Sequence, residues 1–107
     1  MTPKNLFSDI PAELAEEAIH VLVESHGVRI ERIVSRGHIT APGSWYDQDR
    51  AEWVMVVKGQ ARIAFEDRPE PVALGPGEHL VIPARVRHRV VHTDPDQDTI
   101  WLAVHFP

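Results

Sequence analysis

Residues 85–92 read Arg85-Val86-Arg87-His88-Arg89-Val90-Val91-His92. Successive side chains of a β-strand point to opposite faces, so the three arginines share one face and Val86, His88, Val90 and His92 share the other. Three arginines cannot line a closed core, which makes the face of His88 the inward one. An inward histidine needs a partner, because burying an unpaired polar group costs on the order of 1–3 kcal/mol.

Short runs of alternating or β-branched residues lie on both sides of this segment. They span residues 28–40, 53–57, 61–66, 72–74, 79–82 and 99–106. Turn residues separate them, among them Lys58-Gly59-Gln60 and Gly75-Pro76-Gly77-Glu78. Short strands with turn signals about every 8–12 residues are typical of a β-sandwich or small barrel, whose interior can hold side chains or one small ligand. We therefore expect a mainly β fold.

The N-terminal part of the chain has a helical period instead. Its apolar residues recur at helical spacing, and glutamates occupy the positions between them; the apolar positions are Leu14, Ala15, Ala18, Ile19, Leu22 and Val23. Pro11 suits the first turn of a helix, and Gly27 can supply the left-handed residue that ends one. We expect one domain over residues 1–107, with a short N-terminal helical segment in 1–27 and a β-barrel in 28–107.

The composition excludes several classes of function. The chain has 107 residues and a formal net charge of −5, so a nucleic-acid partner is not expected. No apolar run approaches the roughly 20 residues that span a bilayer, and no signal peptide is recognisable, so we expect a cytoplasmic protein with no membrane partner. The absence of cysteine excludes disulfides, thiolate nucleophiles and cysteine-based metal sites. Seven histidines make metal binding the first question.

Glu52 is the second inward polar residue. If Val54 and Val56 face the core, strand alternation turns Glu52 to the same side. An inward carboxylate and an inward imidazole on different strands favour a shared divalent metal ion. Two structural alternatives stay open: His88 as a hydrogen-bonded core histidine, and Glu52 in a buried ion pair with Arg32.

The segment ending at His88 resembles the second motif of the cupin superfamily, small β-barrels that usually hold a divalent metal. That motif runs Gly, five residues, Pro, one residue, Gly, two residues, His, three residues, Asn. Gly77, Pro83 and His88 match it, whereas Arg85 stands at the second Gly and His92 at the Asn. The resemblance covers roughly residues 28–106 and implies a jelly-roll barrel, also called a double-stranded β-helix.

The first cupin motif is only partly present. It ends with Glu, six residues, Gly, which Glu52 and Gly59 match. The His-x-His that usually precedes the Glu is absent. One family spacing puts Trp45 and Asp47 in its place, and the other puts Tyr46 and Gln48 there.

The resemblance implies a divalent metal in the lumen, and mixed carboxylate and imidazole ligation suits Zn, Mn, Fe or Ni. The implied ligands are Asp47 or Gln48, together with Glu52 and His88, and His92 or His38 could add a second nitrogen. Tyr46, His92 and Arg32 are the candidate catalytic residues, as proton carriers or an anion clamp. A metal with open coordination positions suits catalysis.

Three functions stay open, and whether the chain is an enzyme is among the open points. We expect a metal-binding cupin with a small-molecule pocket, which could be an isomerase or lyase acting on a small polar metabolite. The alternatives are a non-catalytic sensor or accessory protein that binds a ligand or metal, and a structural barrel with a vestigial site. We also expect a homodimer, because open sheet edges and aromatic surfaces need cover.

Overall fold

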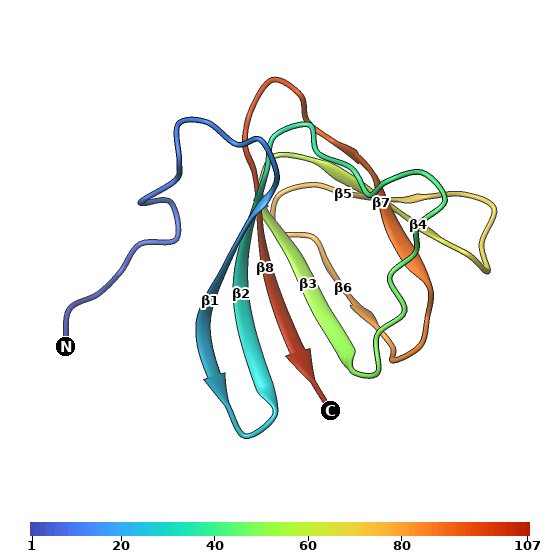
Figure 1. The fold of residues 1–107 in the computed structure, drawn as a ribbon, viewed down its shortest axis with the longest axis horizontal. Helices are drawn as coiled ribbons and strands as arrows, with labels where there is room; N and C mark the ends of the chain where they lie inside the picture. The colour runs from blue at the N-terminus through green and yellow to red at the C-terminus, as the bar shows by residue number, and fades with distance from the viewer.

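The computed structural model describes all 107 residues and contains eight strands and no helix. The strands are β1 (Ala18–Ser25), β2 (Val28–Ser35), β3 (Ala51–Lys58), β4 (Ala61–Phe65), β5 (Val72–Leu74), β6 (His79–Ile82), β7 (His88–Thr93) and β8 (Thr99–Phe106). A five-stranded sheet has the order β1-β2-β8-β3-β6, and a three-stranded sheet has the order β5-β4-β7. Figure 1 shows the two sheets facing each other as the layers of a jelly-roll sandwich. The mainly β prediction is confirmed.

The predicted N-terminal helix is wrong, because residues 18–25 form strand β1 and pair antiparallel with β2. The turn between the two strands explains the difference. His26 and Gly27 have φ of 50° and 81°. A two-residue hairpin loop with positive φ at both positions has the twist that joins antiparallel strands. Gly27 therefore closes a hairpin rather than a helix, and pairing with β2 overrides the helical spacing.

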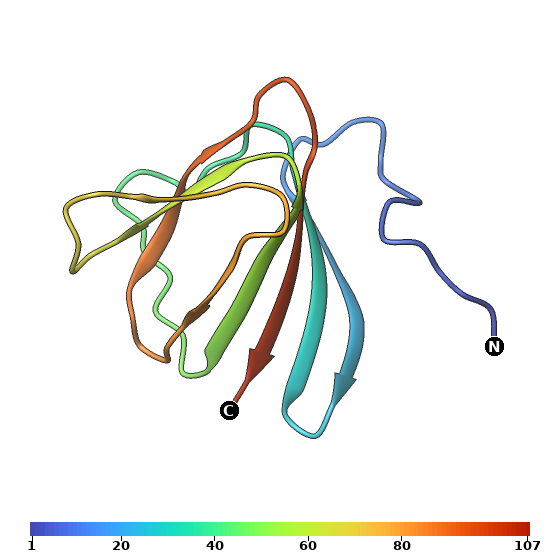
Figure 2. The ribbon, with the colours of Figure 1, turned by 180° about the vertical axis from the view of Figure 1, so that it is seen from behind.

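The segment before β1 runs outside the sandwich for most of its length, and its last residue, Glu17, reaches the space between the sheets. Figure 2 shows this segment on the side of the five-stranded sheet that faces away from the three-stranded sheet. Arg32 holds it there: its Nη1 donates to the carbonyl of Leu6 at 2.9 Å, and its Nη2 donates to the carbonyl of Asp9 at 3.3 Å. The structure contains no helix of the length and apolarity that a membrane crossing requires.

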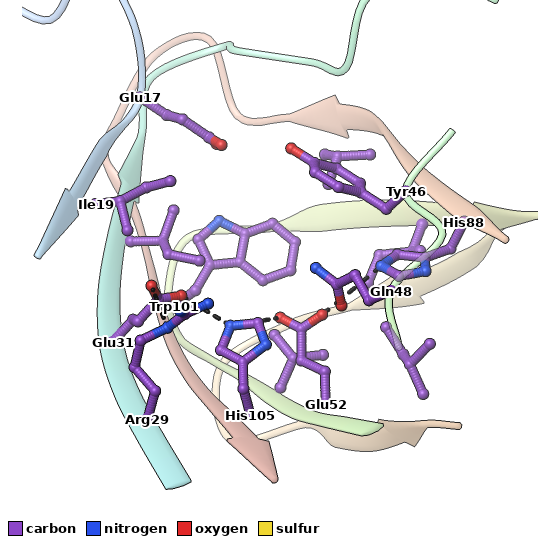
Figure 3. Close-up of a pocket in the computed structure, with 15 residues that line it drawn as sticks. Glu17, Ile19, Arg29, Glu31, Tyr46, Gln48, Glu52, His88, Trp101 and His105 are labelled. Carbon is purple, nitrogen blue, oxygen red and sulfur yellow. Dashed lines mark hydrogen bonds and ion pairs between the residues drawn. The ribbon is translucent and has the colours of Figure 1, made fainter. Parts of the chain in front are cut away.

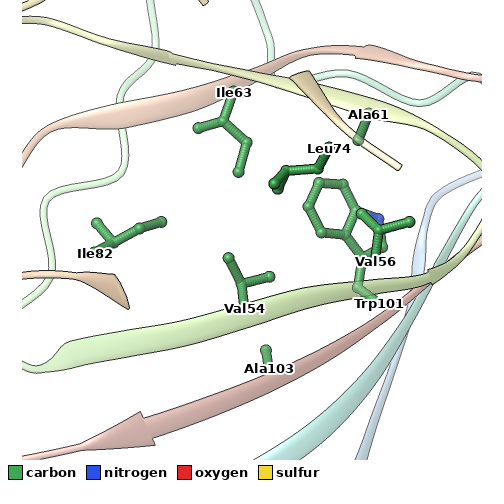
Figure 4. Close-up of a cluster of buried hydrophobic side chains, with 8 residues drawn as sticks. All are labelled: Val54, Val56, Ala61, Ile63, Leu74, Ile82, Trp101 and Ala103. Carbon is green, nitrogen blue, oxygen red and sulfur yellow. The ribbon is translucent and has the colours of Figure 1, made fainter. Parts of the chain in front are cut away.

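The hydrophobic core lies between the two sheets (Figure 4). Its buried members are Val54, Val56, Ala61, Ile63, Leu74, Ile82, Trp101 and Ala103. Glu52, Val54 and Val56 lie on the same face of β3, so the carboxylate of Glu52 is turned toward the same interior. The core therefore continues directly into a polar region of the lumen.

Gly59, in the turn between β3 and β4, has no room for a side chain. A Cβ at this position would lie 2.5 Å from Oγ1 of Thr99 and 2.7 Å from its Cα, and φ is +89°. Both the close approach and the left-handed backbone require glycine. This glycine fixes the end of the strand that carries Glu52.

Candidate functional site

A cavity of about 200 Å³ opens between the two sheets. Its floor is apolar and belongs to the core, with Val54, Ile63 and Trp101 among the lining residues. The polar lining residues are Glu17, Arg29, Glu31, Tyr46, Gln48, Glu52, His88 and His105 (Figure 3). An apolar cavity with a few convergent polar groups is the usual form of a small-molecule site.

Four of these side chains form a row across the cavity (Figure 3). Nε2 of His105 lies 2.8 Å from Oε1 of Glu31 and 3.9 Å from Oε2 of Glu52. Nε2 of His88 lies 3.7 Å from Oε1 of Glu52. Glu31, His105 and Glu52 come from β2, β8 and β3 of one sheet, and His88 comes from β7 of the other. The row therefore bridges the two layers.

His88 is oriented by the backbone. Its Nδ1 lies 2.9 Å from the carbonyl of Val86, which can only accept, so Nδ1 donates and Nε2 is directed at Glu52. Burial is the largest influence on the pKa of His88 and lowers it. The carboxylate of Glu52 and the carbonyl of Val86 together outweigh burial, so the pKa is raised above its ordinary value.

Glu52 is a buried carboxylate without a hydrogen bond. It is 8% exposed, and the two nearest imidazole nitrogens, at 3.7 and 3.9 Å, are beyond hydrogen-bond distance. A buried carboxyl group requires a compensating partner, since desolvation without one is costly. The carboxylate of Glu52 is therefore available to a donor or a cation that enters the cavity.

Tyr46 and Glu17 lie at the opposite side of the cavity. The backbone of Tyr46 is held against β7 by a pair of hydrogen bonds with His88, and the two rings stack with centroids 5.5 Å apart. Burial is the main cause of a raised pKa at Tyr46, and the negative charge of Glu17 adds to it. Oγ of Ser35 donates to Oε2 of Glu17 at 3.2 Å. Figure 3 shows the carboxylate of Glu17 and the phenol of Tyr46 pointing toward each other.

Comparison with known proteins agrees with this architecture. A family model described as a cupin domain matches residues 33–105. The chain belongs to the cupin family. Among curated proteins, none matches the chain.

Solved structures support the same assignment. A candidate mannose-6-phosphate isomerase from Ralstonia eutropha JMP134 is 45% identical, with a TM-score of 0.95 over 99% of this chain and 98% of that one. A cupin superfamily protein from Desulfitobacterium hafniense DCB-2 is 20% identical, with a TM-score of 0.73 over 91% and 83% of the two chains. A cupin with a double-stranded β-helix fold from Methanocaldococcus jannaschii is also 20% identical, with a TM-score of 0.70 over 92% and 87%. The latter two relatives share the fold.

In this cupin, Tyr46 and Gln48 occupy the lumen positions before Glu52. Both line the cavity, and the carbonyl of Gln48 accepts a hydrogen bond from the backbone of Arg85 at 2.7 Å. The extended backbone turns Asp47 the other way, where its carboxylate is exposed and lies 3.4 Å from Nη1 of Arg85. The structure therefore brings Gln48 to Glu52 and His88, and it does not bring Asp47.

Three other predicted residues lie outside the cavity. His92 is displaced by an irregularity of β7: Arg62 pairs with His92 and the next residue, Ile63, pairs with Val90, so one residue is extra and the alternation breaks. Arg32 faces the N-terminal segment rather than the lumen. The structure therefore does not form the ion pair of Glu52 with Arg32 that the sequence left open.

His38 is also engaged away from the cavity. Its Nδ1 accepts from the backbone of Arg36 at 2.8 Å, and its Nε2 lies 3.1 Å from the carbonyl of Leu14. Both ring nitrogens thus contact the backbone. His38 contributes to a neighbouring surface pocket and not to the row of Figure 3.

The sequence reasoning missed Glu17, Glu31, Arg29 and His105. The only available signal was alternation: His105 shares its face of β8 with Trp101 and Ala103, and Glu31 shares its face of β2 with Ile33. Nothing in the sequence pairs these two strands in register, so the contact of His105 with Glu31 required the structure.

Two side chains, those of Glu52 and His88, are placed to share a metal ion, and no third carboxylate or imidazole is gathered with them. No group of three or more histidine, aspartate or glutamate side chains is gathered as a metal site. Two donors that bind one ion at about 2.1 Å each lie roughly 3.0–3.6 Å apart at ordinary coordination angles. The 3.7 Å between Glu52 and His88 is close to this range, whereas Nε2 of His105 is already bonded to Glu31.

Proposed function

We propose that this cupin binds a small molecule in its lumen, together with a divalent transition metal ion held by Glu52 and His88. The observation that carries the proposal is the buried carboxylate of Glu52, which has no hydrogen-bond donor and faces Nε2 of His88 at 3.7 Å. A carboxylate and an imidazole from different strands are common ligands of Zn, Mn, Fe and Ni.

The support for His88 as a ligand comes from its second nitrogen. Histidines that bind metals almost always donate their other ring N–H to a carbonyl, a carboxylate or water. Nδ1 of His88 donates to the carbonyl of Val86, which leaves the Nε2 lone pair of the neutral ring for an ion. Gln48, which lines the same cavity, offers an amide oxygen as a further ligand.

The surrounding residues orient a ligand. A metal in this place would act as a Lewis acid on an oxygen of the ligand and leave positions open for it. Tyr46 offers a hydroxyl at the cavity wall, and its stacking on His88 fixes both rings. Glu31 holds His105 by a 2.8 Å contact, so His105 is positioned to exchange a proton with a ligand next to Glu52. These roles suit an isomerase or lyase acting on a small polar metabolite.

The name of the Ralstonia eutropha relative, which is 45% identical, supports the isomerase class. A non-catalytic ligand-binding or metal-binding role is the second candidate. The observation that favours it is the lack of a third donor gathered with Glu52 and His88, because catalytic zinc sites usually have three protein ligands.

Metal content tests the proposal. The protein is purified without chelator or histidine tag, and its metal is measured by inductively coupled plasma mass spectrometry before and after titration with Zn, Mn, Fe and Ni. We expect near-stoichiometric metal in the wild type and its loss in both Glu52→Gln and His88→Ala. Asp47→Asn and His92→Ala are the matched controls and retain the metal. Metal-free wild type after titration, or unchanged metal in Glu52→Gln and His88→Ala, contradicts the proposal.

We also propose that the protein is a homodimer joined through the outer face of the five-stranded sheet. Alternation turns Trp53, Met55 and Val57 of β3 away from the lumen, and Leu102 and Val104 of β8 lie on the same outer face. A sheet with one face in water normally alternates apolar and polar residues, whereas these strands are apolar on both faces.

The exposed area of the whole chain, which includes the extended N-terminal segment, is larger than a monomer of this mass usually has. The chain exposes 6757 Å², whereas a folded monomer of 12.1 kDa exposes about 6,000 Å². The excess of roughly 700 Å² is close to the area that each partner buries in a standard interface, about 800 Å². The edge strand β1 also exposes Ile19, Val21, Leu22 and Val23.

A further inference from the structure

We propose that the ligand of this cavity is a small organic cation, an amine or ammonium compound, and not a phosphorylated or carboxylated molecule. The inference rests on the proposed function, because it concerns the ligand that the lumen binds. It is carried by the charges and the hydrogen-bonding groups that line the cavity.

Apart from the metal ion proposed at Glu52 and His88, the lining holds more carboxylates than permanently charged cations. Three carboxylates face one guanidinium and two imidazoles. The guanidinium, Arg29, has its Nε 3.1 Å from Oε2 of Glu31, and His105 contacts the other oxygen of the same carboxylate at 2.8 Å. Arg29 and His105 are thus both in contact with Glu31, and no cation contacts Glu17. No lysine lines the cavity, and its single arginine already has an ion pair with Glu31 through Nε.

The ammonium group of the ligand is expected to bind beside the carboxylate of Glu17. This carboxylate receives one hydrogen bond, from Ser35, and points across the cavity toward Tyr46 (Figure 3). The indole of Trp101 lies between this pair and the row that contains Glu52. A carboxylate beside aromatic rings is the arrangement that recognises ammonium groups, through charge and cation–π attraction.

The end of the cavity at Glu17 accepts hydrogen bonds. Glu17 receives one, from Ser35, whereas Glu52 is assigned to the metal ion. A ligand group that complements Glu17 must donate, as ammonium groups do and as ionised carboxylates do not. The volume of about 200 Å³ is below the roughly 300–1,000 Å³ of drug-sized sites, so the cation is small.

Three compounds of equal length test this inference: butylammonium, 1-butanol and butyrate. Each is titrated into the full chain as purified, and binding is followed by ¹H–¹⁵N NMR at the backbone of Glu17 and Tyr46 and at the indole of Trp101. We expect butylammonium to shift these resonances, butanol to bind more weakly, and butyrate to leave them unchanged. Glu17→Gln should weaken butylammonium about tenfold, because it removes a charge-assisted hydrogen bond. Glu13→Gln, an exposed glutamate of the same segment, is the matched control and should bind as the wild type does.

The outcomes separate this inference from the metal proposal. Tighter binding of butyrate or mannose 6-phosphate than of butylammonium overturns the cationic ligand, and so does the absence of any shift. A zinc titration of Glu17→Gln in parallel tests the metal site by itself, since Glu17 is not one of its ligands. If the wild type binds zinc but not butylammonium, only the proposed class of ligand is overturned. If the wild type binds butylammonium but no zinc, only the proposed metal site is overturned.

Discussion

Nε2 of His88 and Oε1 of Glu52 face each other at 3.7 Å from opposite sheets of the sandwich. No other pair in the row connects the two layers, because Glu31, His105 and Glu52 all belong to the five-stranded sheet. This relationship makes the protonation of His88 important both for the site and for the contact between the layers.

The stability of the ligand-free protein should depend on pH through His88. The pKa of His88 is raised in the folded state, because Glu52 and the Val86 carbonyl outweigh burial. A raised folded-state pKa stabilises the fold fully below the unfolded-state pKa, and this contribution is lost as pH rises through the folded-state pKa. We expect the difference in free energy of unfolding between wild type and His88→Asn to be larger at pH 5.5 than at pH 8.5. Urea unfolding at both pH values measures it, and a difference that grows with pH would refute the assignment.

Gly59→Ala should destabilise the protein by about 2–4 kcal/mol, since it combines a steric clash with a strained backbone. The added Cβ would overlap Oγ1 of Thr99. Gly43→Ala is the matched control: its φ is +84°, but no atom lies within 4 Å of the added Cβ. Thermal unfolding of both variants separates the clash from the backbone strain, and equal losses would show that the contact with Thr99 is unimportant.

The hairpin that replaces the predicted helix can be tested at its turn. His26 has positive φ, and asparagine before glycine is the preferred pair for a two-residue hairpin loop. We expect His26→Asn to stabilise the protein by roughly 0.5 kcal/mol, at the lower end of what such local optimisation gives. Chemical denaturation measures the change. A helix over this segment would instead be weakened, because asparagine is a poor helix former.

The proposed dimer predicts that charge on the outer face of the five-stranded sheet separates the copies. Leu102→Glu should give a monomer in size-exclusion chromatography with light scattering, whereas wild type elutes as a dimer. Arg62→Glu, on an exposed position of the three-stranded sheet, is the control and stays dimeric. A wild-type monomer at micromolar concentration would rule out the interface.

Alternation along single strands predicted much of the fold and the central pair of the site. The strands at residues 72–74, 79–82 and 99–106 were predicted with the observed bounds. The inward positions of Glu52 and His88 follow from the alternation of side chains between the two faces of a strand. Such reasoning depends on regular strands. It failed at His92, where an extra residue in β7 reverses the alternation.

The other differences arise from contacts between distant segments. Residues 18–25 satisfy a helical spacing, and only their pairing with β2 makes them a strand. Arg32 and Arg29 belong to the same strand and differ by an odd number of positions, so one faces the N-terminal segment and the other the lumen. Their partners could not be read from the sequence, because the five-stranded sheet brings β2, β8 and β3 together out of chain order.

Anomalous diffraction from crystals grown with zinc, recorded above and below the zinc absorption edge, tests the shared cation most directly. We expect one strong difference peak in the lumen, within coordination distance of both Oε1 of Glu52 and Nε2 of His88. A lumen without a peak, or zinc found only at surface histidines such as His79, would contradict the account.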